Sequence, residues 1–374
     1  MSKKKILILL PVFDLGGAEK QGFYAAKELK ETGSYITEVW AFNKSSGNLI
    51  KLIEEEGIAY KDLNISFTEL NNSKKRLLLY FQFIRKLRKS NFYGILPFTY
   101  HANLITAFCF RFGGVKKALW FQIAMEHHIR VSRFEKFASR FKPIYASNSI
   151  AAGDFISKRH LLDNNQTVYF IPNPFEIKEV KLSREEWRRD LGIKDDEFAF
   201  GIVANFYHEK DHLTLLKAAK LLKDKGLKFK LILAGDNNRS DIYLLKLKAF
   251  ILDSELYDVV KFSGVVQDVP GLLQCFDCGM LTSSTEGSPN ALIEYVAYRR
   301  PVIVSDIKPN MEIVGDNYPY HFPVGNEVKL LEQMESIINR PKGIEKRMEE
   351  LGEKTINKYS QEENQKAFIS ILEA

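Results

Sequence analysis

The sequence is poor in cysteine and contains no hydrophobic run long enough to cross a membrane. Its three cysteines, Cys109, Cys275 and Cys278, are too few for a disulfide framework and are typical of a reducing compartment. The longest apolar runs, 6–13 and 118–125, have the length of a strand, whereas a membrane span needs about 18 residues. Lysines precede the first run as in a signal peptide, but Pro11 interrupts it and no small-residue cleavage site follows. These absences predict a cytoplasmic protein.

At 374 residues the chain is longer than one hydrophobic core usually supports, so we expect two domains. Short apolar runs alternate with amphipathic stretches in both halves. The runs predicted as strands are 6–12, 37–42, 94–98, 118–123, 143–146 and 168–171 in the first half, and 199–204, 228–234, 259–263, 278–281 and 301–304 in the second. This alternation is typical of the α/β class, with a doubly wound parallel sheet in each domain. Ligands of such sheets bind outside the carboxyl ends of the strands, which predicts a site in a cleft between the halves.

Prolines and charges mark the predicted boundary between the domains. Pro172-Asn173-Pro174 and the charged residues that follow it up to Leu182 predict a hinge. The first domain is then 1–176 and the second 177–355. The final segment, 356–374, is expected to form a helix that packs back on the first domain.

Positive charge is concentrated in the first half of the chain. The net charge is +7, with +12 through Pro174 and −5 in the remainder. Residues 74–89 mix leucines and aromatic residues with seven cations, and two interpretations remain open for them. As an amphipathic helix, the segment either lies on an anionic membrane surface or covers a sheet with a solvated basic face. The basic first half favours a peripheral contact with the inner face of a membrane. We find no nucleic-acid-binding module and expect no nucleic-acid partner.

The most informative segment is Thr285-Glu286-Gly287-Ser288-Pro289-Asn290-Ala291-Leu292-Ile293-Glu294. It follows the apolar run 277–281, which is predicted to be a buried strand. Ser288 is a good N-cap and Pro289 suits the first helical position, so we expect a helix to begin there and to present an anion-binding N-terminus. Glu286 in the loop and Glu294 in the helix add carboxylates that accept hydrogen bonds from hydroxyls. The segment therefore predicts a site for a phosphorylated, hydroxyl-rich ligand.

Two further segments of the first half are candidates for a site. Gly16 and Gly17 follow the first strand, where they form either a phosphate-binding turn or a simple tight turn, and both interpretations stay open. His127 and His128 follow the strand 118–123, at the end where ligands of a parallel sheet bind. We favour a functional role for His127 and a surface position for His128.

His208-Glu209-Lys210-Asp211-His212 contains the letters of a zinc-protease motif. That chemistry needs both histidines on one helical face. Here a strand precedes the motif and Asp211 is a good N-cap, so the histidines would not share a face, and a zinc hydrolase is the disfavoured alternative. We expect Lys210 to be a cation that holds a diphosphate. Cys275 and Cys278 form a Cys-x-x-Cys pair without a second such pair in the sequence, which favours a structural role over metal binding.

The segment from Glu286 to Glu294 resembles the Glu-x7-Glu element of the retaining glycosyltransferases of family 4, which have the GT-B fold of two facing Rossmann-like domains. Four other segments, 11–19, 171–174, 261–270 and 302–314, also resemble this family. The resemblance covers nearly the whole chain and is most specific in the second domain.

The resemblance implies a role for each matching residue. Glu294 would bind the donor ribose and Glu286 the transferred sugar, while Lys210 would neutralise the leaving diphosphate and His127 would lie beside the sugar. The other donor-binding residues implied are Gly16, Gly17, Asn205, Val265, Ser288, Pro289, Asn290, Ala291 and Leu292. The donor would be a UDP- or GDP-linked sugar, and no cofactor or metal is expected.

Two positions depart from the family. Asn205 stands where the family usually has an arginine, which removes a charge-assisted contact with the diphosphate. Arg299 and Arg300 stand where the family commonly turns with glycine.

These observations predict an enzyme, a retaining glycosyltransferase that moves a sugar to a hydroxyl of a glycan or lipid-linked acceptor in surface-polysaccharide synthesis. A nucleotide-sugar 2-epimerase of the same architecture, a zinc hydrolase built on His208 and His212, and a non-catalytic sugar-nucleotide binder are the alternatives.

Overall fold

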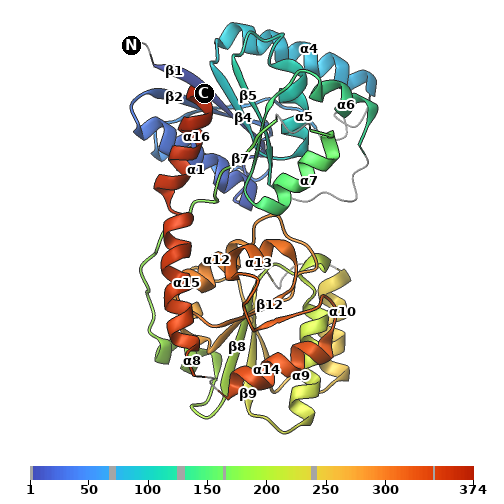
Figure 1. Cartoon of the computed structure of the whole chain (residues 1–374), viewed down its shortest axis with the longest axis vertical. Coiled ribbons are helices and arrows are strands. Elements are labelled where there is room, and N and C mark those ends of the chain that lie inside the picture. Colours follow the sequence, from blue (N-terminus) through green and yellow to red (C-terminus); the bar gives the residue numbers. More distant parts are fainter. Residues whose placement is uncertain (1–2, 67–72, 124–130, 163–165, 237–241, 340–341) are drawn as a thin grey trace. The chain divides into compact units, whose positions relative to one another are not determined.

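The chain folds into two compact units. We use a computed structural model, which describes residues 3–66, 73–123, 131–162, 166–236, 242–339 and 342–374. Unit 1 comprises Met1–Pro174 and Tyr359–Ala374, and unit 2 comprises Phe175–Lys358 (Figure 1). No helix in these described ranges combines the length and the hydrophobicity needed to cross a membrane.

Unit 1 is built on a parallel seven-stranded sheet in the order β3-β2-β1-β4-β5-β6-β7. Its strands are β1 (Lys4–Val12), β2 (Tyr35–Asn43), β3 (Ala59–Asp62), β4 (Gly94–Pro97), β5 (Lys117–Gln122), β6 (Ile144–Ser147) and β7 (Val168–Phe170). Its helices include α1 (Gly17–Glu31), α2 (Ile50–Glu55), α4 (Ser73–Ser90), α5 (Tyr100–Cys109), α6 (Arg133–Ser139), α7 (Ile150–His160) and α16 (Gln361–Glu373). The edge strand β3 was not predicted, because all four of its residues are exposed and it has no apolar pattern.

Unit 2 is built on a parallel six-stranded sheet in the order β10-β9-β8-β11-β12-β13. Its strands are β8 (Phe198–Val203), β9 (Phe229–Ala234), β10 (Val260–Gly264), β11 (Cys278–Leu281), β12 (Val302–Ser305) and β13 (His321–Phe322). Its helices include α8 (Arg184–Leu191), the 3-10 turn η1 (His208–Lys210), α9 (His212–Asp224), α10 (Ile242–Asp253), α11 (Val269–Cys275), α12 (Asn290–Ala297), α13 (Lys308–Val314), α14 (Glu327–Ile338) and α15 (Ile344–Lys358). The predicted α/β class with two parallel Rossmann-like sheets is confirmed.

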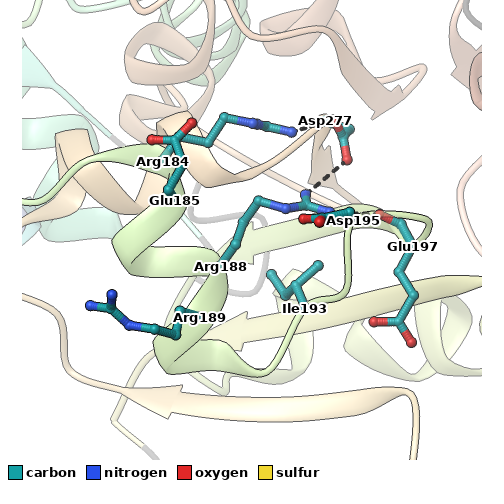
Figure 2. A pocket seen from close by; sticks show the side chains of 8 residues that line it. All are labelled: Arg184, Glu185, Arg188, Arg189, Ile193, Asp195, Glu197 and Asp277. Carbon is teal, nitrogen blue, oxygen red and sulfur yellow. Dashed lines mark hydrogen bonds and ion pairs between the residues drawn. The ribbon is translucent and has the colours of Figure 1, made fainter.

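An arginine pair fastens α8 to the start of the unit 2 sheet (Figure 2). Asp277, just before β11, accepts hydrogen bonds from Arg184 at 2.7 Å and from the backbone N–H of Ala199 at 2.8 Å. Arg188 contacts the same carboxylate at 3.3 Å and donates to the carbonyl of Glu197 at 2.8 Å. Because Ala199 and Asp277 lie at the amino ends of β8 and β11, this contact is at the edge of the sheet opposite the carboxyl ends.

The hollow beside this contact is lined by three arginines, four carboxylates and Ile193, so its positive and negative charges nearly cancel (Figure 2).

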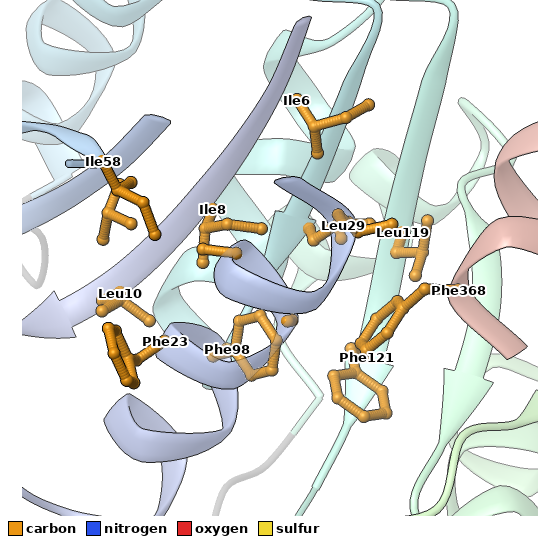
Figure 3. Packing of buried hydrophobic residues seen from close by; sticks show 14 of the residues in the cluster. Ile6, Ile8, Leu10, Phe23, Leu29, Ile58, Phe98, Leu119, Phe121 and Phe368 are labelled. Atoms are coloured by element: carbon orange, nitrogen blue, oxygen red, sulfur yellow. The ribbon is translucent and has the colours of Figure 1, made fainter. Parts of the chain in front are cut away.

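The core of unit 1 explains the long apolar run of β1. Ile6, Ile8 and Leu10 face one side of the sheet and pack in a cluster with Phe23 and Phe368 (Figure 3). The alternate residues Leu7 and Leu9 face the other side, in a cluster that includes Trp40, Tyr80 and Phe83. A central parallel strand is buried on both faces, which is why its sequence is apolar without alternation.

The last helix, α16, belongs to unit 1. Phe368, Ile371 and Leu372 are buried in the β1 cluster. The hydroxyl of Tyr93 donates to the carbonyl of Leu372 at 3.1 Å. Residues synthesised after the whole of unit 2 therefore complete the core of unit 1.

Helix α1, which packs against α16, carries a buried carboxyl group. The side chain of Gln365 donates to the backbone carbonyl of Glu28 at 2.8 Å. The Glu28 side chain is buried, and neither of its carboxylate oxygens has a hydrogen-bond partner among the described residues. Burial, with the nearby charge of Glu31, raises the pKa of Glu28 from 4.5 to about 8.

A second buried carboxylate of unit 1, Glu135, is fully paired. It accepts hydrogen bonds from Arg159 at 2.6 and 2.9 Å and from the hydroxyl of Tyr100 at 2.9 Å, and it contacts His160 Nε2 at 2.9 Å. His160 also contacts the hydroxyl of Tyr145 at 3.1 Å. Burial opposes ionisation, but the contacts with His160 and Arg159 outweigh it and lower the pKa of Glu135. This network joins α5, α6 and α7.

Candidate functional site

The sheet of unit 2 has one topological switch point, between β8 and β11. The chain proceeds from β8 to β9 on one side, and the later strand β11 pairs with β8 on the other side. In open parallel sheets the loops diverge at such a point and leave a crevice outside the carboxyl ends of the strands. The loop after β8 carries Lys210, and the loop after β11 carries Glu286.

Lys210 and Glu286 meet at this switch point, although 76 residues separate them. The Lys210 ammonium lies 2.5 Å from Glu286 Oε1, and the two side chains are 26% and 10% exposed. Two further hydrogen bonds join the loops, because Thr282 Oγ1 donates to the Lys210 carbonyl at 2.8 Å and the backbone N–H of Ser284 donates to the Glu209 carbonyl at 2.8 Å. The cation and the carboxylate are therefore held by a common frame.

Buried polar side chains hold Glu286 in position through a series of hydrogen bonds. Ser283 donates to Glu286 Oε1 at 2.6 Å, and Ser305 donates to the Ser283 carbonyl at 2.6 Å. The side-chain amide of Asn310 donates to the carbonyl and hydroxyl of Ser305 at 2.9 and 3.0 Å. Ser283, Ser305 and Asn310 are fully buried. Sequence reasoning missed these positioning residues; their one signal is a hydroxyl residue at or just past the end of each of the apolar strands β11 and β12.

Helix α12 begins one residue later than predicted. Pro289, not Ser288, is its N-cap. The reason is that the backbone N–H groups of Leu292 and Ile293 both donate to the Pro289 carbonyl, at 3.0 and 3.1 Å, so the helical ladder starts there. The Leu292 amide, predicted to face the ligand, is thus engaged inside the helix, and its side chain is buried. Ser288 and Ala291 are half-buried and Asn290 is exposed.

Glu294 is half-buried in α12, and its neighbour Tyr295 fixes the helix on the sheet. The backbone N–H of Val203, the last residue of β8, donates to the Tyr295 hydroxyl at 2.7 Å. A Cβ at Gly279 in β11 would lie 2.9 Å from the Tyr295 ring, so only glycine leaves room for this side chain. The anchor sets the position of α12 relative to β8 and β11.

The remaining predicted donor-binding residues of unit 2 lie on the surface. Asn205 is exposed in the loop after β8, where its carbonyl accepts from the Tyr207 N–H at 2.8 Å. Val265 is 66% exposed just after β10. Asn205 follows β8 and Val265 follows β10, so both residues lie at the carboxyl ends of strands, in the half of the sheet formed by β8, β9 and β10.

His208 and His212 do not form a shared metal face. His208 is exposed in η1, whereas Asp211 caps α9 by accepting from the Thr214 N–H, as predicted. The ring of His212 is buried 4.9 Å from that of Phe206, and its pKa is lowered to about 3 by burial and by the charge of Lys210. Within the described ranges, no group of three or more His, Cys, Asp or Glu side chains is placed to hold a metal ion.

The glycine turn of unit 1 lies at the switch point of its own sheet, between β1 and β4. Gly16 is the N-cap of α1 and Gly17 its first residue. A Cβ at Gly16 would lie 2.2 Å from a carboxylate oxygen of Glu19, so this carboxylate covers the turn. Burial, with the nearby charge of Asp14, raises the pKa of Glu19. His127 lies outside the described residues.

The chemistry available at the unit 2 switch point follows from these groups. An ammonium group binds an anion, a carboxylate accepts hydrogen bonds from hydroxyls, and both are partly shielded from water, which strengthens their interactions. The site fits a ligand that carries negative charge and hydroxyl groups side by side.

Residues 183–358 match the family described as Glycosyl transferases group 1. The chain is 34% identical to the putative glycosyltransferase EpsF of Bacillus subtilis over 148 residues. This aligned stretch is 39% of this chain and 36% of EpsF. It is 24% identical over 320 residues to the capsular polysaccharide biosynthesis glycosyltransferase CapH of Staphylococcus aureus, 83% of both chains. The match thus spans about a third of EpsF and most of CapH.

The fold matches that of solved glycosyltransferases. The structure of Anabaena Alr3699/HepE in complex with UDP and glucose superposes with a TM-score of 0.82 at 19% identity and covers 99% of this chain and 100% of that chain. A glycosyltransferase from Rickettsia africae gives a TM-score of 0.82 at 17% identity and covers 100% of this chain and 98% of that chain. Residues 183–358, just under half of the chain, thus resemble the group 1 glycosyltransferases, and the chain as a whole shares the GT-B fold of the solved structures.

Proposed function

We propose that the protein is a retaining glycosyltransferase that moves a sugar from a nucleoside-diphosphate sugar to a hydroxyl of a glycan or lipid-linked acceptor. The observation that carries the proposal is the Lys210–Glu286 pair at the switch point of unit 2. A cation for the diphosphate and an acceptor for sugar hydroxyls stand together where a parallel sheet binds its ligand.

Lys210 stabilises the charge that develops during transfer. The bond between the anomeric carbon and the β-phosphate oxygen breaks, and its electron pair remains on the phosphate. The acceptor oxygen bonds to the anomeric carbon, and its proton leaves with the nucleoside diphosphate. An ammonium group held in place before the reaction favours this developing charge over the ground state.

Glu286 orients the transferred sugar, and Glu294 binds the ribose. In the free protein the carboxylate of Glu286 accepts from Lys210 and Ser283. A donor diphosphate competes for Lys210, which leaves a Glu286 oxygen for sugar hydroxyls while Ser283 keeps the carboxylate in position. Asn205 makes the diphosphate site less cationic than an arginine would, so Lys210 carries more of the binding.

Surface-polysaccharide synthesis is the proposed setting. It rests on the similarity to CapH, whose name places that protein in capsular polysaccharide biosynthesis, and on the basic charge of the first half. Complexes of HepE with UDP and with UDP-glucose make a UDP-linked sugar the first donor to test, with GDP-linked sugars next.

A thermal-shift panel of nucleotide sugars tests the proposal. A donor at a hundred times its Kd should stabilise unit 2 by about 2.7 kcal/mol, which is roughly 5–10 °C for a domain of this size. Lys210→Ala and Glu294→Ala should remove the shift. The matched control is Lys217→Ala on α9, whose side chain is 43% exposed and pairs with Glu327 at 3.7 Å. Failure of every nucleotide sugar to stabilise the wild type would overturn the proposal.

Product analysis separates transfer from epimerisation. Incubation with donor alone should return the donor unchanged apart from slow hydrolysis. A converted nucleotide sugar in that sample would identify the epimerase alternative. With acceptor present, the anomeric coupling constant of the product reports whether configuration is retained.

A further inference from the structure

The positive charge of the chain comes from one segment of unit 1. Residues 73–142 contain fifteen lysines and arginines and two carboxylates, Glu126 and Glu135. The rest of the chain has 39 cations and 45 carboxylates, a net charge of −6. Glu135 is fully buried and paired with Arg159, and Glu126 lies outside the described residues. Every described charge that this segment shows to solvent is therefore positive.

Helix α4, the first element of this segment, has two apolar faces. Tyr80, Phe83, Ile84 and Leu87 form the inner face and are buried in the unit 1 core. On the outer side, Leu77, Leu78 and Phe81 are 49%, 61% and 62% exposed. Because the inner face already anchors the helix, the fold does not account for these three side chains.

Cations bracket the exposed apolar residues along the helix. Lys75 precedes them, and Arg85, Arg88 and Lys89 follow them, all exposed. Leu78, Phe81, Arg85 and Lys89 are spaced three or four residues apart and so lie on one face. The face therefore combines an apolar centre with a cationic rim.

Exposed apolar and cationic side chains also occur on the elements next to α4, namely the turn after α5 and helix α6, and Figure 1 shows the ribbons of α4, α5 and α6. Arg88 donates to the Phe112 carbonyl at 2.8 Å, and the Phe112 ring lies 5.3 Å from that of Phe141. Phe112 is 44% exposed, and Phe137 of α6 is 46% exposed. The exposed cations next to them in sequence are Arg111, Lys136, Arg140 and Lys142. We call the outer face of α4 together with 110–112 and α6 the α4 surface.

We propose that the α4 surface docks unit 1 on an anionic lipid bilayer. Leu77, Leu78 and Phe81 enter the boundary between headgroups and acyl chains, while the surrounding lysines and arginines bind lipid phosphates. A second copy of this chain is a poorer occupant, because an isologous contact would oppose cation to cation. A nucleic acid would use the cations and leave the exposed leucines and phenylalanine without a partner. The inference does not depend on the chemistry at Lys210.

Co-sedimentation of the full chain with vesicles tests this docking. The protein should sediment with vesicles of equal parts phosphatidylglycerol and phosphatidylcholine and remain in the supernatant with phosphatidylcholine alone. Leu78→Gln with Phe81→Gln should weaken binding about fivefold per side chain, from the lost apolar burial. Arg85→Gln with Lys89→Gln should also weaken it about fivefold per cation. Added salt should reduce the contribution of the cations.

A matched control is available on α10 of unit 2. Leu245 and Leu252 are 56% and 69% exposed; two lysines, Lys246 and Lys248, lie between them and two carboxylates, Asp253 and Glu255, follow, so the local charge is balanced rather than cationic. Leu245→Gln with Leu252→Gln should leave vesicle binding within about twofold of the wild type. Circular dichroism of each variant establishes that it is folded.

Three results would overturn the proposal. One is a wild-type protein that does not bind anionic vesicles at low salt. Another is a folded Leu78/Phe81 variant that binds as tightly as the wild type, which would show a polyanion-binding surface without insertion. The last is a wild-type dimer that the same variant converts to a monomer without vesicle binding, which would assign the surface to a second copy.

Discussion

Two buried glutamates of unit 1 should respond in opposite ways to the same substitution. Glu135 is held by Arg159, His160 and Tyr100, whereas the carboxyl group of Glu28 has no hydrogen-bond partner among the described residues. Replacement by glutamine keeps the shape and removes the charge in both positions. We expect Glu135→Gln to destabilise unit 1 and Glu28→Gln to stabilise it.

The magnitudes follow from the charge that each site accommodates. Glu135→Gln leaves the buried Arg159 without its counter-charge, which should cost about 3 kcal/mol and lower the Tm by roughly 6–12 °C. Since the pKa of Glu28 rises from 4.5 to about 8, its side chain is largely protonated in the folded protein at pH 7 and ionised in the unfolded chain. This difference in protonation lowers the free energy of unfolding by about 1.4 kcal/mol for each pH unit above 4.5. Glu28→Gln removes this cost and should raise the free energy of unfolding by up to about 3 kcal/mol at pH 7.

The two effects also differ in their pH dependence. A raised folded pKa means that the stability from Glu28 is present below pH 4.5 and lost as the pH rises towards 8, so the gain from Glu28→Gln should grow over that window. A lowered folded pKa means that the stability from Glu135 is present near neutral pH and lost in acid. The loss caused by Glu135→Gln should therefore shrink as the pH falls below the unfolded value.

Urea denaturation at pH 5, 7 and 8 measures both effects. Trp40 and Trp120 are buried in unit 1 and report its unfolding by fluorescence. Glu55→Gln on α2 is the control, because that side chain is 57% exposed and should change little. Equal signs for the two buried substitutions, or a pH-independent effect of Glu28→Gln, would refute the reasoning.

Three further predictions concern buried positions. Gly279→Ala pushes a methyl group against the Tyr295 ring and should destabilise unit 2 by about 1–3 kcal/mol in a thermal melt, and an unchanged Tm would contradict the anchor. Phe368→Ala should destabilise unit 1 by about 3–5 kcal/mol and leave donor-induced stabilisation of unit 2 intact, as a two-transition calorimetric scan would measure. The pKa of the buried His212 imidazole is about 3, so the wild type loses stability as the pH falls below 6.5. His212→Phe removes this group and should be about 2 kcal/mol more stable than the wild type at pH 5, relative to their difference at pH 7. The same acid dependence of stability in both proteins would count against this prediction.

The strands and the main site loops could be predicted because their signals are local. An apolar run such as that of β1 follows from burial on both faces of a parallel sheet, and the N-cap at Asp211 follows from its side chain. The two-residue strand β13 carries too short a pattern, and its pairing with β12 depends on the folded chain. At α12 the N-cap propensity of Ser288 does not set the start of the helix, because the Pro289 carbonyl accepts the first two helical hydrogen bonds.

The contacts that support the site were not predictable from sequence spacing. The hydrogen bonds among Asn310, Ser305 and Ser283 join α13, the end of β12 and the loop after β11, and no local sequence pattern connects these three residues. Glu135 and Arg159 belong to short helices whose charges are usual for a solvated face, yet they are buried together. Polar networks of this kind depend on which loops the sheet order brings together, and this order is a property of the whole fold.

The return of the chain to unit 1 at Tyr359 has a consequence for biosynthesis. Unit 2 is one continuous stretch of sequence inserted into unit 1, whose core includes Phe368, Ile371 and Leu372. On the ribosome, unit 2 can finish folding while the β1 cluster still lacks these side chains. The half of the protein that is made first is thus the half that matures last, and a nascent chain that stops before α16 exposes an unfinished apolar surface.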